Sequence, residues 1–246
     1  MKISYNWLKE YVNIKLAPDR LAHALTMAGL SVEAVKPYGQ DHIFEIEVTA
    51  NRPDWLSVIG VAREVAALTG GRLKIPSNPR IKVMPSKFGI KVRVEERGLC
   101  PRYTARIIRN VKVGEAPAWL KARIEALGMR SVNNIVDITN FCLFETGEPM
   151  HAFDLDKIEG AEIIVRKALP GEKITLIEGA AKVLDKSMLV IADGRKTIAI
   201  AGVMGALNTE VTYSTKNILL EAAYFDQVSV RRTSRKLAIS TESSYR

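Results

Sequence analysis

Residues 161–225 read AEIIVRKALPGEKITLIEGAAKVLDKSMLVIADGRKTIAIAGVMGALNTEVTYSTKNILLEAAYF, and this stretch decides the fold class. Apolar runs of strand length, such as EIIVRKA, MLVIAD, TIAIAGVMG and NILLEAAYF, are separated by PGE, EGA and DGRK, whose residues are typical of turns. Strands in such close succession predict a largely antiparallel sheet.

Helical patterns lie before and after this stretch. A helix is predicted over 17–29, where Pro18 suits the first turn and Gly29 supplies the stop. Asp54 and Asp226 are placed to cap two more helices. The other patterns predict helices over 55–68, 115–128, 226–239 and from Ser131, and strands over 1–5, 44–48, 90–96 and 103–113. The predicted fold class is α+β, with mixed, largely antiparallel sheets and packed helices.

A proline-rich segment suggests where the chain divides. Residues 73–87 contain Pro76, Pro79 and Pro85 among Ser, Asn and Lys, with weak periodicity. A chain of 246 residues is long enough for two modest domains. We therefore expect an N-terminal α/β domain over 1–80 and a second domain over 88–246.

Composition narrows the class of protein. The chain is 47% hydrophobic and 26% charged, as in soluble globular proteins, and lacks both a signal peptide and the roughly 18 apolar residues of a membrane helix. We expect a cytoplasmic location and no membrane partner. Cys100 and Cys142 form no CxxC pair, and three scattered histidines predict no metal site. Lys and Arg exceed Asp and Glu by nine, which favours polyanions but also suits basic proteins that bind no nucleic acid.

A polar-rich segment, SVNNIVDITNFCLFETGEPMHAFD at 131–154, leads to a family resemblance. The motifs RYTARII, MRSVNNIVDITNF, GEPMHAFDLDKI, VRKALPGEK, LVIAD, AIAGVMG, LLEAAYF and RRTSRKLAISTESSYR follow one another from 102 to 246. In this order they closely resemble the bacterial phenylalanyl-tRNA synthetase beta subunit, and 98–246 is similar to its central editing module. MKISYNWLKEYV, LTMAGLSVEAV and FEIEVTANRPDWLSVIGVAREVAALTG resemble the first domain of that subunit.

The resemblance implies a role in translation and also implies which activities of the ligase this chain lacks. Family members use ATP and magnesium to join phenylalanine to tRNA(Phe), but that site lies on the alpha subunit, so we expect no cofactor in this chain. The usual tRNA-binding OB insert is missing, because Val35 to Phe44 joins the flanking pieces in about ten residues. Further beta-subunit domains are expected beyond Arg246. The implied activity is hydrolysis of mischarged tyrosyl-tRNA(Phe), with tRNA(Phe) and the alpha subunit as partners.

The resemblance also implies the site residues. As catalytic residues it implies His151, Arg130, Asn140 and Thr241, and as substrate-binding residues Glu221, Pro149, Gly205 and Ser243. The Glu221 carboxylate can accept a hydrogen bond from a tyrosine phenol, a group that phenylalanine lacks. His151 is suited to orient water or bind the tRNA terminus, and Arg130 to anchor a phosphate or ribose. Asn140 and Thr241 can position water or the ester carbonyl, and Gly205 allows close backbone approach.

Two positions differ from the usual family pattern. Ser243 stands where many members have Ala, and Ala206 where a second Gly is usual. Both changes add atoms near the implied pocket wall. We therefore expect an effect on pocket size or amino-acid preference.

Each assignment has a simpler structural interpretation. Without the resemblance, His151 is a satisfied histidine, Asn140 ends a helix, Arg130 caps the preceding helix and Thr241 caps a turn, while Glu221 pairs with a basic residue. A basic cluster on the last helix either contacts tRNA phosphates or forms a solvated face; it consists of Arg231, Arg232, Arg235 and Lys236. The alternatives to an editing hydrolase are a non-catalytic scaffold or tRNA-binding part of the beta subunit, and a free-standing relative that binds another amino-acid-like ligand.

Overall fold

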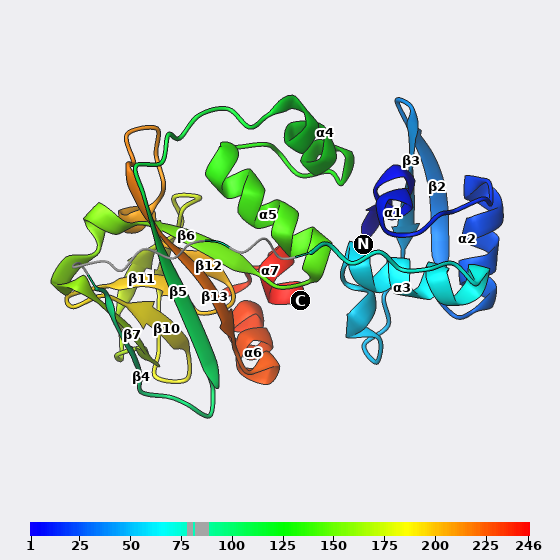
Figure 1. The fold of residues 1–246 in the computed structure, drawn as a ribbon. Helices are drawn as coiled ribbons and strands as arrows, with labels where there is room; N and C mark the ends of the chain where they lie inside the picture. The colour runs from blue at the N-terminus through cyan, green and yellow to red at the C-terminus, as the bar shows by residue number, and fades with distance from the viewer. Residues whose placement is uncertain (78–80, 82–88) are drawn as a thin grey trace. The chain divides into compact units, whose positions relative to one another are not determined.

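The structure is a computed structural model that describes residues 1–77, 81 and 89–246 (Figure 1). These residues form two compact units. The first unit comprises the described part of 1–83 together with 116–132 and 140–148, and the second comprises the described part of 84–115 together with 133–139 and 149–246. Most of the predicted linker, 73–87, lies outside the described residues. The compact units interleave along the chain, and the sequence domains 1–80 and 88–246 remain a prediction.

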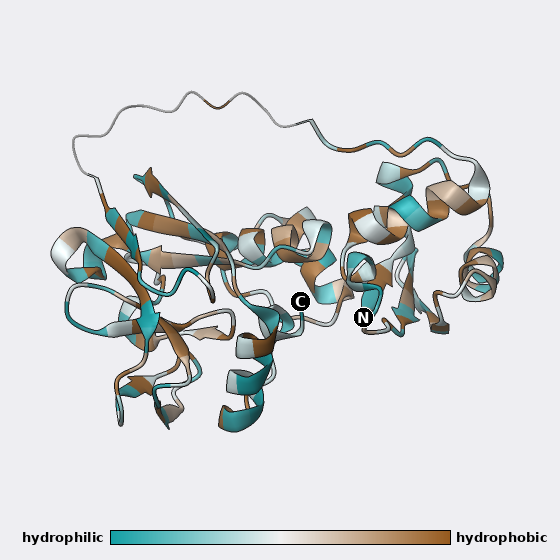
Figure 2. Ribbon diagram, turned by 90° about the horizontal axis from the view of Figure 1, so that it is seen from below, coloured by the Kyte–Doolittle hydropathy of each residue, from teal (hydrophilic) through white to brown (hydrophobic). Residues whose placement is uncertain are grey.

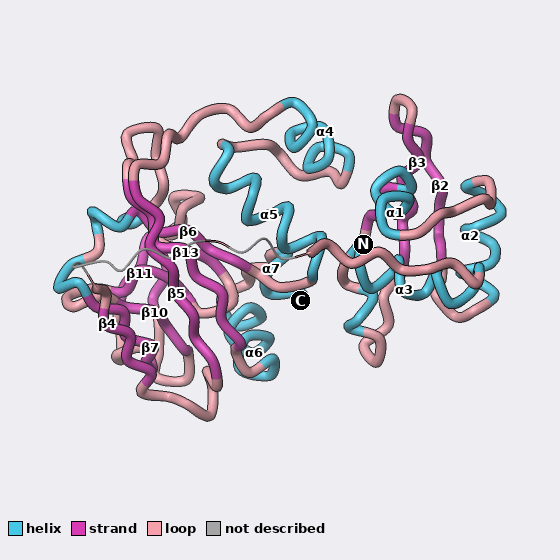
Figure 3. Tube along the Cα trace, in the orientation of Figure 1, coloured by secondary structure: helices cyan, strands magenta, loops and turns pink. Residues whose placement is uncertain are grey.

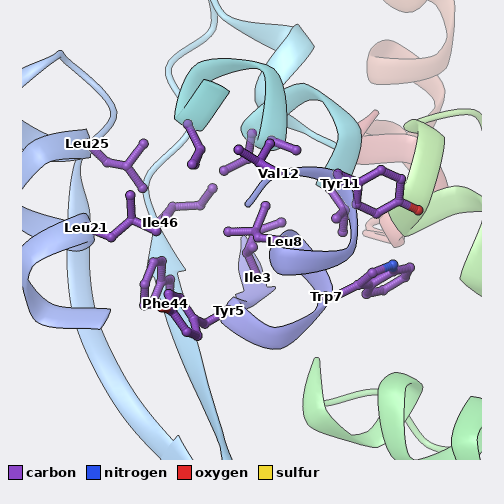
Figure 4. Close-up of a cluster of buried hydrophobic side chains, with 14 of the residues drawn as sticks. Ile3, Tyr5, Trp7, Leu8, Tyr11, Val12, Leu21, Leu25, Phe44 and Ile46 are labelled. Carbon is purple, nitrogen blue, oxygen red and sulfur yellow. The ribbon is translucent and has the colours of Figure 1, made fainter. Parts of the chain in front are cut away.

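The first unit is built on a small antiparallel sheet with the strand order β1-β3-β2. Its strands are β1 (Lys2–Ser4), β2 (Val32–Tyr38) and β3 (Asp41–Ile46), and its helices are α1 (Tyr5–Tyr11), α2 (Pro18–Met27), α3 (Val58–Thr69) and α4 (Ala118–Ala126). Apolar side chains from these elements, among them Ile3, Leu8 and Phe44, form one fully buried cluster (Figure 4). Each such side chain contributes about 1.5–3 kcal/mol when buried, so this unit has a core of its own.

The predictions for this unit are confirmed for α2 and corrected at two places. The expected strand over 1–5 ends at Ser4, whose Oγ accepts a hydrogen bond from the Trp7 amide at 2.9 Å and so starts α1, a helix that the pattern did not reveal. Asp54 was the wrong cap: Ser57 caps α3 by accepting from the Gly60 amide at 3.0 Å, while Arg52 binds the Asp54 carboxylate. The expected joint over 35–44 consists of the facing ends of β2 and β3 and the turn between Tyr38 and Asp41.

The second unit contains two packed sheets and a small hairpin. The sheet we call the β10 sheet has the order β12-β11-β10-β7-β4, and the β13 sheet has the order β5-β13-β6. Their strands are β4 (Lys91–Val94), β5 (Arg102–Arg109), β6 (Met150–Asp154), β7 (Glu162–Lys167), β10 (Leu189–Ala192), β11 (Thr197–Ile200), β12 (Met204–Gly205) and β13 (Asn217–Tyr224), with β8 (Lys173–Thr175) and β9 (Ala181–Val183) as the hairpin. Within the described residues β4 and β7 are parallel and the other pairs are antiparallel. This confirms the predicted fold class.

The two sheets enclose the core of the second unit (Figure 3). Phe153 and Leu219 from the β13 sheet pack with Ile163, Val165 and Ile198 from the β10 sheet, and all five are buried. Hydrophobic and hydrophilic residues both occur along the elements in Figure 2, as elements with one buried face require. The inner face of the β13 sheet therefore contributes apolar side chains to this core.

The remaining elements of the fold are helices. α5 (Asn134–Thr146) begins three residues later than predicted, because the Asn133 Oδ1 accepts from the amides of Ile135 and Val136 at 3.0 and 2.9 Å. α6 (Gln227–Leu237) is capped by Asp226 as predicted, and α7 (Glu242–Tyr245) follows it. Short 3-10 helices cover Pro53–Trp55, Leu155–Lys157, Glu159–Ala161 and Leu207–Thr209. No described helix has the length and apolar character needed to cross a bilayer.

Candidate functional site

His151 and Glu221 are direct neighbours across two strands. β6 and β13 are antiparallel, and their register pairs His151 with Glu221 and Phe153 with Leu219. Residues paired in this way have side chains on the same face of a sheet. Since Phe153 and Leu219 lie in the core between the sheets, His151 and Glu221 face the same interior, and Glu221 is only 4% exposed.

Gly205 provides the space for the His151 ring. A Cβ atom on residue 205 would lie 2.5 Å from the His151 Cε1 and 2.6 Å from its Nε2, so the imidazole rests on the backbone of β12. On another side the ring meets Phe153 edge-on, with centroids 4.5 Å apart. The predicted close approach at Gly205 is thus made by a protein side chain, and any larger residue there would displace the ring.

The His151 imidazole is neutral and has an unused nitrogen. Burial lowers the pKa of His151 to about 4, so the ring carries no charge near pH 7. The Nε2 atom is buried and has no hydrogen-bond partner among the described residues. Buried polar atoms in native proteins are nearly always paired. The interpretation of His151 as a satisfied histidine is therefore wrong for Nε2 within the described part of the chain.

Tyr103 and Cys100 also lie in the neighbourhood of Glu221. Burial raises the pKa of Tyr103 well above its usual value and that of Cys100 to about 11, and the negative charge of Glu221 adds to both shifts. The Cys100 Sγ donates to the Arg102 carbonyl at 3.5 Å, whereas the buried Tyr103 hydroxyl has no described partner. The sequence analysis missed Tyr103. The alternating pattern around Tyr103 predicted a half-buried strand, but the burial of the Tyr103 hydroxyl depends on the neighbouring strands.

Thr241 caps α7 and joins it to the residue that precedes β12, the strand with Gly205. Its Oγ1 accepts from the Ser244 amide at 3.1 Å and donates to the Val203 carbonyl at 2.9 Å. Ser244, whose Oγ accepts from the Thr241 amide at 2.9 Å, completes this capping box. The simpler interpretation of Thr241 as a cap is confirmed, and its only hydroxyl proton is used inside the protein. Ser243 and Pro149 are half-buried in the same unit.

Arg130 and Asn140 belong to the first compact unit, whereas His151, Gly205 and Glu221 all belong to the second. Arg130 is exposed and follows α4. Asn140 is half-buried within α5 and does not end that helix, which continues to Thr146. Ala206, near Gly205, is buried and donates its amide to the Ile198 carbonyl at 2.9 Å.

The basic cluster on α6 is exposed to solvent. All four residues of this cluster are exposed on α6, whose buried residues are Thr233 and Leu237; the cluster consists of Arg231, Arg232, Arg235 and Lys236. Lys236 forms an ion pair with Asp185 at 2.6 Å. Across the part of the chain that the structure describes, no three His, Cys, Asp or Glu side chains gather as a metal site requires.

Comparisons with known proteins agree with the family resemblance. The profile of the B3/4 domain family matches residues 99–246. Curated phenylalanine–tRNA ligase beta subunits from Moorella thermoacetica and Carboxydothermus hydrogenoformans are each 51% identical to 84% of this chain, which covers 26% of their length. The beta subunit from Rhodopirellula baltica is 44% identical over 100% of this chain and 36% of its own length.

A solved N-terminal fragment of the beta subunit from Pyrococcus horikoshii is more remote. It has a TM-score of 0.47 and 16% identity, covering 97% of this chain and 73% of that one. The chain spans about a quarter to a third of the length of the curated relatives named above. With a B3/4 domain over more than half of its residues and curated relatives at about 50% identity, the chain belongs to the phenylalanine–tRNA ligase beta subunit family.

Proposed function

We propose that this chain carries the editing site of the ligase and hydrolyses the ester of tyrosyl-tRNA(Phe). The observation that carries the proposal is the pairing of His151 and Glu221 on one inward face, with the His151 Nε2 buried and without a described partner. A carboxylate acceptor and a neutral imidazole, paired across two strands on the inward face, suit a substrate that brings its own hydroxyl.

Glu221 would select for tyrosine. Its carboxylate can accept the phenol proton of a tyrosyl group, and a phenylalanyl group offers no such donor. Sites built to bond a substrate hydroxyl reject the analogue that lacks it by about 10⁴–10⁵-fold. Editing at Glu221 would thus spare correctly charged tRNA.

His151 would orient the attacking water. A pKa of about 4 makes it a poor general base near pH 7, where an efficient base has a pKa close to the ambient pH. A neutral imidazole can still hold a water molecule at Nε2, and hydrolysis of an activated ester depends mainly on a positioned water and a stabilised oxyanion. We assign no protein nucleophile.

The remaining assignments form the rest of the proposal. The exposed basic cluster on α6 would contact the tRNA backbone, whereas roles for Arg130 and Asn140 stay predictions from the family resemblance. tRNA(Phe) and the ligase alpha subunit are the proposed partners, and the cytoplasm the proposed location. Synthesis of phenylalanyl-tRNA, with ATP and magnesium, is proposed for the complete ligase and not for this chain.

A scaffold role is the second candidate, and one observation favours it. The Thr241 hydroxyl gives its proton to the Val203 carbonyl, so it has no second proton to give to a substrate. A third candidate is the binding of another amino-acid-like ligand at the same polar groups.

The test is deacylation of tyrosyl-tRNA(Phe) by this chain and by two variants, Glu221→Gln and His151→Ala. Glu178→Gln is a matched control, because Glu178 is an exposed carboxylate in the same unit. We expect hydrolysis by the unaltered chain and the control, and a fall of at least tenfold in both site variants. Background rates in all four proteins would remove the hydrolase proposal and leave the scaffold role.

A further inference from the structure

Two buried polar atoms without a described partner flank the central strand of the β13 sheet. One is the His151 Nε2 on β6, and the other is the Tyr103 hydroxyl on β5. β13 lies between these two strands and carries Glu221. The strand with the buried Glu221 carboxylate is thus flanked by two buried polar groups that have no hydrogen-bond partner among the described residues.

The register places Tyr103 on the same face as Glu221. β5 and β13 pair Ala105 with Glu221 and Tyr103 with Ala223. Residues 103 and 105 point to the same side of β5, so Tyr103 is the diagonal neighbour of Glu221, about 7–8 Å away between Cα atoms and within reach of a long aromatic side chain. Ala223 is paired with Tyr103 and Ala105 with Glu221, and both are alanines with a single methyl side chain.

Packing accounts for the Tyr103 ring but not for its hydroxyl. The ring packs against the core between the sheets. A phenylalanine would fill the same volume without burying an unpaired hydroxyl, which is unfavourable. Burial and the Glu221 charge raise the pKa of Tyr103 well above its usual value, so the hydroxyl keeps its proton and is a donor. Cys100 is no substitute, because its thiol already donates to the Arg102 carbonyl.

We propose that Tyr103 is a specificity-determining residue, whose hydroxyl donates a hydrogen bond to the phenol oxygen of a bound tyrosyl group while Glu221 accepts the phenol proton. A phenol has one proton to give and lone pairs to receive, so it matches this pair of groups. A phenylalanyl group matches neither of them. The inference rests on the proposed function and adds a second, independent source of discrimination to it.

The test is Tyr103→Phe, with Tyr213→Phe as the matched control because Tyr213 belongs to the same unit and is 69% exposed. The readout is the ratio of kcat/KM for tyrosyl-tRNA(Phe) to that for phenylalanyl-tRNA(Phe). We expect this ratio to fall about tenfold in Tyr103→Phe, the effect of one neutral hydrogen bond, and to be unchanged in the control. The melting temperature of Tyr103→Phe should be equal to or higher than that of the unaltered chain, since an unpaired hydroxyl has been removed.

The outcomes separate this inference from the proposed function. A Glu221→Gln chain that loses its selectivity, beside a Tyr103→Phe chain that keeps it, would leave the editing function standing and overturn the role of Tyr103. Thermal shift with free L-tyrosine and L-phenylalanine gives a second measure, since a ligand that binds the native state raises its melting temperature. Tyrosine should stabilise the unaltered chain more than phenylalanine does, and Tyr103→Phe should reduce that difference. Equal shifts in the unaltered chain, together with background hydrolysis, would overturn both.

Discussion

Replacing Gly205 with alanine tests the geometry around His151 most directly. The new Cβ would lie 2.5 Å from the His151 Cε1, whereas carbon atoms in contact are best separated by about 3.5–4.0 Å. The ring or the strand must therefore move by roughly 1 Å. The strand is held by its pairing with Ala199 and by the Ile177 amide, which donates to the Gly205 carbonyl at 3.2 Å. The ring has Phe153 on another side.

The magnitude follows from this confinement. Forcing one extra methyl group into a packed interior costs about 1–3 kcal/mol of stability. If His151 positions the attacking water, a displacement of about 1 Å also lowers the rate of deacylation by about 10²-fold. Urea unfolding measures the free energy of unfolding, and single-turnover hydrolysis of tyrosyl-tRNA(Phe) measures the rate.

Gly98→Ala is the matched control for this experiment. Gly98 belongs to the same unit, and a Cβ there meets no atom within 4 Å. We expect this variant to keep both its stability and its rate of hydrolysis. A Gly205→Ala chain as stable and as active as the control would refute the close approach of ring and backbone.

Three further predictions concern acid stability, helix capping and nucleic-acid binding. His151 titrates near pH 4 when folded and near 6.5 when unfolded, so its protonation favours the unfolded chain as the pH falls; between pH 6.5 and 4 this should remove up to about 3 kcal/mol, measurable as a slope of unfolding free energy that His151→Gln reduces. Ser57→Ala should cost about 1 kcal/mol in urea unfolding because it removes the α3 cap, whereas Asp54→Ala should leave that cap intact. Replacing Arg231 and Arg232 with alanine should reduce the slope of log K for tRNA binding against log salt concentration by about one to two, because fewer counterions are released on binding. An unchanged slope would mean that α6 presents a solvated face and does not contact tRNA.

Much of the fold was predictable because it depends on neighbouring residues. The sequence predicted α2 from Pro18 at its first position and α6 from Asp226 at its cap. It predicted the strands after residue 161 from short apolar runs between turns. The missed elements are short or lie inside other patterns. α1 has seven residues and follows a strand directly, and β6 has five residues inside the polar-rich segment at 131–154. Such lengths are too brief for a clear period.

For the candidate site, too, the sequence identified individual residues and the tertiary structure showed how they are arranged. The motifs in the sequence identified the family and named His151, Gly205 and Glu221, because each motif is a local string of residues. Only the tertiary structure showed that His151 opposes Glu221, that its ring rests on Gly205, and that the Tyr103 hydroxyl is buried beside them without a described partner. Strand register and burial arise from pairing between segments far apart in the chain, and a shift of one residue would turn every side chain of a strand to the opposite face.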